Sequence, residues 1–326
     1  MRTKVKELRI GLTVALVIGL VCVARDASAL LDNVPYVANG RTLTAQAGTA
    51  GDATYFNNLF FFGYIAPDGN VAILADSNLG SSGQSVVYSY EIATKATDGV
   101  ALAVDNGTLY LFYVQGYGSS GYTGLAMITS TDGVHWSPED FFSYGAVGGG
   151  TGEFGAPTAV VWDGQVLLYI SELGYHLEQY NISGTSTSGP YITFGNYETY
   201  STPTRPSATV WQGRLEVAFT DAANGNEIGL ISYTDATGWS SEVLTGVSGI
   251  PDLFPLAAGA LNMVYRPSND HIYSTFTSNG VTFSTPQEDT ASTTYHAPIQ
   301  FSNWGLSANW VFYIGENNEL FTVLEN

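Results

Sequence analysis

The chain has 326 residues, 45% of them hydrophobic, and its 29 acidic residues outnumber its 10 lysines and arginines to give a net charge of −19. This acidic balance excludes nucleic acid and anionic membrane surfaces as expected partners. A single cysteine cannot form an intramolecular disulfide, so stability has to come from a hydrophobic core, which a chain of this length can supply.

The first 29 residues have the three-part layout of a secretory signal peptide. Basic residues lead into the apolar run IGLTVALVIGLVCVA, and the small-residue sequence ASA follows at Ala27–Ala29. An uncleaved membrane anchor is the alternative, but about 15 apolar residues are fewer than the roughly 20 that a bilayer span needs. We therefore expect residues 30–326 to form a single domain that is secreted, either extracellular or periplasmic.

Six segments of the remaining chain share one pattern, in which a short apolar run, a polar turn and a second apolar run end in an aromatic residue. The closing aromatics recur every 46 to 56 residues, at Tyr64, Tyr113, Tyr169, Phe219, Tyr265 and Tyr313. A loop follows each one, and then one or two further runs with alternating residues. Runs of this composition between turn residues predict β-strands, four to a repeat.

Six repeats of four short strands predict an all-β fold, a six-bladed β-propeller of four-stranded antiparallel blades. The expected blades are residues 51–98, 99–154, 155–203, 204–252, 253–294 and 295–326. The sixth repeat ends after its third strand, which would leave an unpaired edge. Residues 30–45 precede the first repeat and are expected to supply the missing strand, so that an N-terminal strand closes the propeller.

The sequence STDGVHW, Ser130–Trp136, falls between the third and fourth strands of the second repeat. YTDATGW and TSNGVTF hold the same place in the fourth and fifth repeats. Asp-Gly and Asn-Gly pairs at such places are typical of tight hairpin turns. The residues expected to build these turns are Ser130, Asp132, Gly133, Trp136, Asp235, Trp239, Asn279 and Gly280. A catalytic role for Asp132 is the alternative to its turn role.

These three turns resemble the Asp-box of the sialidase-like β-propellers, in a variant one residue shorter than usual between Asp and Gly. The resemblance implies that hydroxyl and carboxylate side chains hydrogen-bond the hairpin backbone and that Gly has a positive φ. It also implies that the aromatic residue packs between neighbouring blades. These implications concern architecture rather than activity, because one fold serves many functions.

Binding residues are expected on one face of the propeller, formed by the loops that join the second strand to the third and one blade to the next. These loops hold most of the rare cations and histidines. The candidate ligand-binding residues are Arg205, Arg266, Glu172, His176, Tyr117, Tyr122, His271 and His296. Each arginine either contacts ligand or pairs with a nearby carboxylate. The separated histidines form no two-histidine motif, so no metal site is predicted from them.

Two acidic residues, Glu153 and Asp221, are the candidate catalytic groups if the protein is an enzyme. The stretch GEFGAP around Glu153 resembles the glutamate-bearing stretch of five-bladed glycosidases, and glycosidases use two carboxylates. No cofactor is expected, although the loop DAANGNE, Asp221–Glu227, has oxygen donors for Ca²⁺ and is otherwise an ordinary polar turn. The arginine cluster of a sialidase cannot be assembled from the sequence.

The sequence therefore favours a secreted propeller that binds an extracellular carbohydrate, with aromatic faces for sugar rings and carboxylates or amides for hydroxyls. A glycoside hydrolase with carboxylates on the same face is one alternative. A scaffold that binds another protein through an apolar patch is the other. The ligand is expected between the third and fifth repeats.

Overall fold

The computed structural model of the chain describes residues 31–38, 41–47, 49–77, 86–117, 122–142, 155–172, 176–183, 186–193, 204–256, 259–294, 299–302, 309–315 and 317–325. The expected signal peptide, residues 1–29, lies outside them. Within this part of the chain, no helix is long and apolar enough to cross a membrane.

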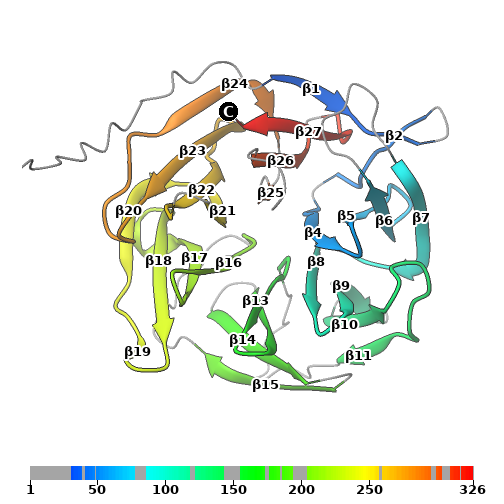
Figure 1. Ribbon diagram of the computed structural model, residues 1–326, viewed down its shortest axis with the longest axis horizontal. Helices are drawn as coiled ribbons and strands as arrows, with labels where there is room; N and C mark the ends of the chain where they lie inside the picture. Colours follow the sequence, from blue (N-terminus) through cyan, green and yellow to red (C-terminus); the bar gives the residue numbers. More distant parts are fainter. Residues whose placement is uncertain are drawn as a thin grey trace, which may run out of the picture.

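Six antiparallel sheets in the described residues surround a central axis, and Figure 1 shows them in the view along that axis. We number these sheets as blades in chain order. Blade one comprises β4 (Asp52–Phe56), β5 (Leu59–Ile65), β6 (Asn70–Asp76) and β7 (Val86–Lys95). Blade two comprises β8 (Val100–Asp105), β9 (Thr108–Tyr117), β10 (Tyr122–Ser130) and β11 (Asp140–Phe142). Blade three comprises β12 (Thr158–Trp162), β13 (Gln165–Glu172), β14 (His176–Ser183) and β15 (Ser186–Thr193).

The other three blades follow the same order, with the first strand of each nearest the axis (Figure 1). Blade four comprises β16 (Ser207–Trp211), β17 (Arg214–Asp221) and β18 (Glu227–Thr234), and both β19 (Gly238–Trp239) and β20 (Val243–Ser248) pair with β18. Blade five comprises β21 (Ile250–Pro255), β22 (Leu261–Arg266), β23 (His271–Thr277) and β24 (Gln287–Thr293). Blade six comprises β25 (Ile299–Ser302), β26 (Asn309–Ile314), β27 (Leu320–Glu325) and β1 (Leu31–Pro35).

The N-terminal strand β1 closes the propeller by pairing antiparallel with the C-terminal strand β27. The predicted six-bladed architecture and its closure are therefore confirmed. The closing strand is shorter than the expected residues 30–45, since β2 (Val37–Ala38) and β3 (Arg41–Thr42) form a separate hairpin. After this hairpin the chain returns to blade six, where Leu320 N donates to Leu43 O at 3.1 Å and Ala45 N donates to Asn318 O at 2.8 Å.

Two-residue turns join the first and second strands in blades one to four. Both turn residues have positive φ in every case: Asn57 and Asn58, Asn106 and Gly107, Asp163 and Gly164, Gln212 and Gly213. This backbone is that of the type I′ turn, whose twist matches that of the flanking strands. The polar pairs seen in the sequence therefore fix the register of each inner hairpin.

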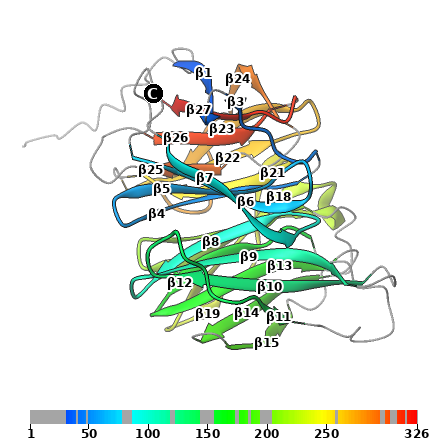
Figure 2. The same ribbon diagram turned by 90° about the vertical axis from the view of Figure 1, so that its right-hand side faces the viewer.

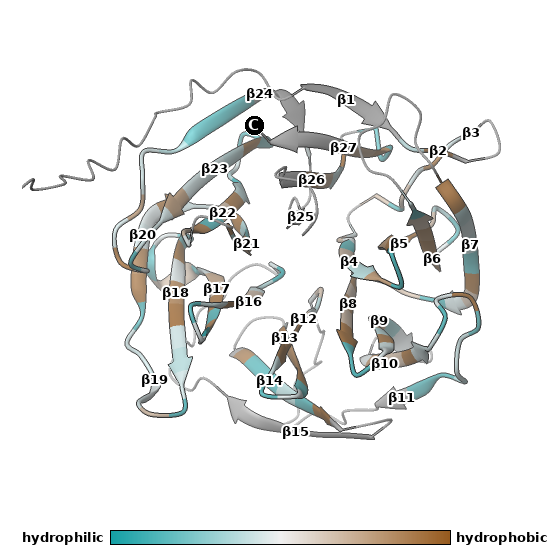
Figure 3. Cartoon of the chain, in the orientation of Figure 1, coloured by the Kyte–Doolittle hydropathy of each residue, from teal (hydrophilic) through white to brown (hydrophobic). Residues whose placement is uncertain are grey.

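The hydrophobic core consists of six clusters, each shared by two adjacent blades in the described residues. Between blades six and one, for example, Phe312 lies 4.6 Å from Phe62, measured between ring centroids. Figure 3 shows the apolar segments on strands such as β8 and β18, while the turns are hydrophilic. Burial between blades therefore holds each sheet against its neighbours and leaves the axis free of a single large core.

Candidate functional site

The propeller has two faces, and the strands run between them, as the side view in Figure 2 shows. We call the face with the first-to-second and third-to-fourth strand turns the hairpin face. The opposite face, with the second-to-third loops and the connections between blades, is the loop face. A hydrogen bond of 3.3 Å from Asn57 Nδ2 to Thr131 O joins the two kinds of turn on the hairpin face.

Arg205 lies at the loop-face end of the axis, where it connects four blades. Its Nη2 is 2.9 Å from Asp52 Oδ1 in blade one, and its Nη1 is 3.9 Å from Asp252 Oδ1 in blade five. Its Nε donates to Pro157 O, just before blade three, at 3.0 Å. The Arg205 side chain is 3% exposed. We call Arg205, Asp52, Asp252 and Ser207 the axial cluster.

The two aspartates of the axial cluster also accept hydrogen bonds from their own surroundings. Asp52 accepts from Leu102 N at 2.7 Å and from Ala53 N at 2.9 Å. Ser207 Oγ donates to Asp252 Oδ1 at 3.1 Å. Burial raises the pKa of the Asp52 carboxyl above its ordinary value, while the Arg205 charge acts in the opposite direction. The cluster is thus a buried ion-pair network that joins blades across the axis.

The inner strands of blades one to five line a cavity of about 400 Å³ on the axis, with the axial cluster at its inner end. The walls combine small apolar side chains, such as Ala53, Ala159 and Ala208, with hydroxyl-bearing ones, such as Thr158 and Thr209. At the loop-face end Asp52 and Asp252 are 7% and 5% exposed, whereas Tyr55, three residues further along β4, is 44% exposed. The cavity is therefore open toward the hairpin face.

Direct contact between inner strands closes the loop-face end on the side of blades one and two. Ala50 N donates to Asp98 O at 3.0 Å, and Val100 N donates to Ala50 O at 3.1 Å. A Cβ built on Gly99 would lie 2.6 Å from Ala156 Cβ at the start of blade three. Only glycine permits this approach, so the starts of the inner strands of blades one, two and three lie in direct contact at the loop-face end.

The predicted binding residues Arg266 and His271 both lie at the loop-face end of blade five and form ion pairs there. Arg266 Nη1 bonds Asp270 Oδ1, and His271 Nδ1 lies 2.6 Å from Glu288 Oε1. The Arg266 Nε is buried without a hydrogen-bond partner among the described residues. Arg266 thus has the carboxylate pairing that was one of its two interpretations, and His271 also pairs with a carboxylate. The role of both residues in ligand binding stays a prediction.

Asp221, a candidate catalytic or Ca²⁺-binding residue, builds its own loop. It precedes a short 3₁₀ helix, Ala222–Asn224, and accepts from Ala223 N at 2.9 Å and from Asn224 Nδ2. Glu227, at the end of the same loop, accepts from Gly246 N at 2.6 Å. Both carboxylates therefore have protein donors. The described residues contain no group of three His, Cys, Asp or Glu side chains arranged for a metal ion.

Glu242 lies close to Asp221 and Glu227 and has a perturbed acidity. Burial, and after it the neighbouring carboxylates of Asp221 and Glu227, raise the pKa of Glu242 from 4.5 to about 7. Its Oε1 is buried against Gly229 of β18 and has no hydrogen-bond partner among the described residues. Sequence reasoning missed this residue, because its neighbours become close only through the pairing of β20 with β18.

We expect the charge of Glu242 to make folding stability depend on pH. The folded state retains a proton between pH 4.5 and about 7 that the unfolded state releases, so stability falls as pH rises through this window. Glu242→Gln should remove that part of the dependence: the variant should match the wild type near pH 4.5 and exceed it above pH 7. Urea unfolding at both pH values measures this. The prediction is wrong if the free energy of unfolding changes equally between the two pH values in the variant and the wild type.

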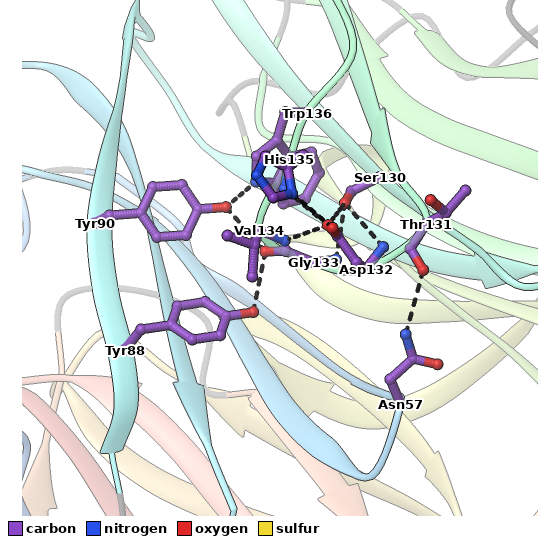
Figure 4. A network of polar contacts seen from close by, with 10 residues as sticks. All are labelled: Asn57, Tyr88, Tyr90, Ser130, Thr131, Asp132, Gly133, Val134, His135 and Trp136. Atoms are coloured by element: carbon purple, nitrogen blue, oxygen red, sulfur yellow. Dashed lines mark hydrogen bonds and ion pairs between the residues drawn. The ribbon is translucent and has the colours of Figure 1, made fainter.

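The turn Ser130–Trp136 is an internally bonded hairpin that also contacts blade one (Figure 4). Asp132 Oδ1 accepts from Val134 N and His135 N, both at 2.8 Å, and Ser130 Oγ accepts from Gly133 N at 2.8 Å. The His135 ring also bonds the Asp132 carboxylate, with Nδ1 2.7 Å from Oδ2. This bond, followed by the two backbone N–H bonds from His135 and Val134, lowers the pKa of the Asp132 carboxyl. The Asp132 contacts are those of a turn residue, and none involves a cavity.

Two tyrosines of β7 fix this turn against blade one. The hydroxyls of Tyr88 and Tyr90 both donate to Gly133 O at 3.0 Å, and Trp136 Nε1 donates to Tyr90 Oη (Figure 4). Gly133 has a φ of 80°, and Trp136 packs against the core between blades one and two. The turn therefore joins two blades as well as two strands.

The equivalent turns of blades four and five differ from each other. In blade five, Asn279 Oδ1 accepts from Val281 N and Thr282 N, both at 2.9 Å, which repeats the Asp132 arrangement. In blade four, Thr237 N donates to Thr234 Oγ1 at 3.2 Å and Gly238 has a φ of 70°. Asp235 accepts no hydrogen bond there from the described residues. The expected role of Asp235 is thus corrected: with an extra residue before Gly238, the threonine hydroxyls replace it.

Asp132→Ala should lower the melting temperature and leave ligand binding unchanged, because it removes acceptors that only the turn uses. Asp132→Asn should melt close to the wild type at pH 7, since Asn279 already serves in the same geometry. Thermal unfolding with a glycan-binding assay on the same samples measures both effects. Loss of binding in a variant with an unchanged melting temperature would instead assign Asp132 to the site.

The remaining predicted residues lie at the loop face or outside the described residues. Tyr117 is directly opposite Tyr122 where β9 and β10 begin to pair, and Glu172 is opposite His176 on β13 and β14. Glu153 and His296 lie outside the described residues. The structure therefore pairs these predicted residues in two adjacent blades, two and three. The sequence analysis did not identify Asp52 and Asp252, the aspartates of the axial cluster. The signal for them was a polar residue near the start of an otherwise apolar inner strand.

No protein-family model matches this sequence, and no curated protein sequence matches it. Solved structures do match in fold. A lectin of the fungus Aleuria aurantia, described as a six-bladed β-propeller with fucose recognition, is 15% identical with a TM-score of 0.63, over 86% of this chain and 93% of the lectin. The GH93 α-L-arabinofuranosidase of Fusarium graminearum is 10% identical with a TM-score of 0.65, over 90% and 97%.

The sialidase of Trypanosoma rangeli is 10% identical with a TM-score of 0.56, over 91% of this chain and 58% of the sialidase. Identities this low establish a shared fold and no shared chemistry. The chain therefore shares its β-propeller fold with a fucose-binding lectin, a sialidase and an α-L-arabinofuranosidase.

Proposed function

We propose that the protein is a secreted, carbohydrate-binding propeller that does not cleave its ligand. The observation that carries the proposal is the axial cavity, whose walls mix apolar and hydroxyl-bearing side chains and whose inner end holds a buried arginine and two carboxylates. Sites for small polar molecules combine such walls with a few fixed polar groups. The lectin and glycosidase structures of the same fold support a carbohydrate as the ligand.

Binding is favoured over hydrolysis by the state of the described carboxylates. A glycosidase needs an acid and a base or nucleophile that reach the glycosidic bond. Asp52 is held by Arg205 and two backbone N–H groups, and Asp221 by the donors of its own loop. Arg214, one of the four arginines after residue 29, lies over the Trp211 ring at 4.8 Å and pairs with Glu216 at 3.0 Å, away from Arg205 and its aspartates.

Other parts of the proposal rest on the sequence. Secretion rests on the signal-peptide pattern of residues 1–29. The net charge of −19 makes nucleic acid and anionic membranes unfavourable partners. Ca²⁺ is not required for binding in this proposal, because the oxygen atoms of Asp221 and Glu227 already accept hydrogen bonds within the protein.

A glycan array combined with chromogenic glycosides tests this function. We expect the chain without residues 1–29 to bind a defined subset of glycans, to do so equally in EDTA, and to release no chromophore. Chromophore release that is lost in Glu153→Gln but retained in Glu172→Gln would favour the hydrolase instead. Binding to no glycan on the array would contradict the proposal.

A further inference from the structure

We propose that the axial cavity takes a single neutral sugar residue, which enters from the hairpin face with its hydroxyls directed at Arg205 and Asp252. This inference rests on the proposed carbohydrate-binding function and adds the site, the side of approach and the class of sugar. It differs from the expectation from the sequence, which put the ligand at the loop face.

An unsatisfied donor at the inner end of the cavity indicates what the ligand must offer. Arg205 Nη1 is buried and has no hydrogen-bond partner among the described residues, although the side chain lines the cavity. It lies 3.9 Å from Asp252 Oδ1, which is too long for a hydrogen bond. A buried donor without a partner is destabilising, so a ligand that accepts from it gains affinity. A hydroxyl can accept from Nη1 and donate to a carboxylate, so it fits between them.

The charge at this end of the cavity selects against acidic sugars. One guanidinium faces two carboxylates, Asp52 and Asp252, so the cluster is negative overall when both are ionised. A carboxylate or sulfate on the ligand would meet like charges at low dielectric, which weakens its binding. A neutral sugar has only the hydrogen bonds to gain and no such repulsion.

The size and walls of the cavity select a single sugar residue. About 400 Å³ is near the lower end of the roughly 300–1,000 Å³ typical of small-molecule sites. The aliphatic side chains in the walls suit the C–H face of a pyranose, and the threonine hydroxyls suit its polar edge. Near the open end, the half-exposed ring of Tyr55 packs on Phe60 with centroids 4.9 Å apart. A rigid aromatic face there can stack on the next sugar of a longer glycan.

The test blocks the cavity without changing the axial cluster. Thr209 lines the cavity and is half-buried on β16, so Thr209→Trp fills the space in front of the cluster. Val281→Trp is the matched control, because Val281 is 61% exposed in the blade-five turn on the same face and does not line the cavity. Titrations followed by saturation-transfer NMR use methyl glycosides of neutral hexoses and 6-deoxyhexoses, with N-acetylneuraminic acid as the anionic probe.

We expect Thr209→Trp to lose binding of the neutral glycosides by at least about tenfold and Val281→Trp to bind like the wild type. A second variant, Asp252→Asn, keeps the acceptor for Ser207 Oγ and should weaken binding by about tenfold through loss of a charge-assisted hydrogen bond. Circular dichroism shows whether Thr209→Trp folds. If it does not fold, the Asp252→Asn variant alone tests whether the ligand binds at the axial cluster.

The possible results separate this inference from the proposed function. Wild-type binding of neutral glycosides that survives both Thr209→Trp and Asp252→Asn would overturn the axial site and leave carbohydrate binding in place. Tighter binding of N-acetylneuraminic acid would overturn the choice of a neutral sugar. Absence of binding to every probe and to the glycan array would overturn the proposed function, and the axial site with it.

Discussion

Arg205→Met should destabilise the protein by about 3–5 kcal/mol, the cost typical of removing one partner from a buried ion pair. Asp52 is 9% exposed by its side chain and would keep its carboxylate without the guanidinium 2.9 Å away. The substitution also removes the donor to Pro157 O. Because Arg205 connects blades one, three, four and five, we expect the variant to unfold in a single cooperative transition. The midpoint of that transition should lie at a lower urea concentration than in the wild type.

The pH dependence distinguishes this charge effect from a packing defect. In Arg205→Met the pKa of Asp52, already raised by burial, has lost its main opposing charge and rises further. The folded state then holds a proton that the unfolded state releases above its ordinary pKa, so stability falls as pH rises from about 4. The deficit relative to the wild type should therefore shrink toward pH 4, and Asp52→Asn should partly rescue the variant at pH 7.

Lys95→Met provides the control for these measurements. Lys95 Nζ lies 3.8 Å from Asp68 Oδ2, but both side chains are more than half exposed, at 61% and 53%. Exposed pairs contribute less than about 1 kcal/mol. A deficit for Arg205→Met no larger than that of Lys95→Met would show that the axial cluster is not an important link between blades.

The sequence was sufficient for the features that depend on local chemistry. Asn-Gly, Asp-Gly and Gln-Gly pairs required positive φ and marked the inner hairpins, as at Gly107 and Gly164. The aromatic residue that closed each repeat, such as Tyr113 or Tyr169, became a fully buried position between blades. Since both signals recur with one period, the number of blades and the need for a closing strand followed from the sequence.

The candidate site depended on contacts that the sequence does not encode locally. Arg205 was chosen because cations are rare, but its partner Asp52 belongs to a blade more than 150 residues earlier in the chain. The close approach of Ala50, Gly99 and Ala156 at the loop-face end is set by how three blades meet. The repeat pattern predicts the strands of each blade. It does not predict the cavity or the ion pairs that the inner strands of several blades form around the axis.

Gly133→Ala should destabilise the protein by about 2–5 kcal/mol, for two reasons that add. A φ of 80° costs a residue with a Cβ about 1–2 kcal/mol. The new Cβ would also lie 2.4 Å from Phe61 Cζ and 2.9 Å from Tyr88 Oη, and forced packing of this kind costs about 1–3 kcal/mol. Phe61 is fully buried between blades one and two, so it has little room to move.

Gly107→Ala isolates the backbone contribution, because Gly107 has a φ of 75° in the same blade and a Cβ there would meet nothing within 4 Å. We expect it to lose only about 1–2 kcal/mol. Urea unfolding of both variants gives their free energies of unfolding, provided that the dependence on urea concentration is the same in both. The difference between the two losses is the contribution of the contact with Phe61. Phe61→Leu in the Gly133→Ala background should recover part of that difference, because it removes the ring atoms that the Cβ meets. Equal losses for Gly133→Ala and Gly107→Ala would mean that the turn is free to move away from blade one, and that it closes only its own hairpin.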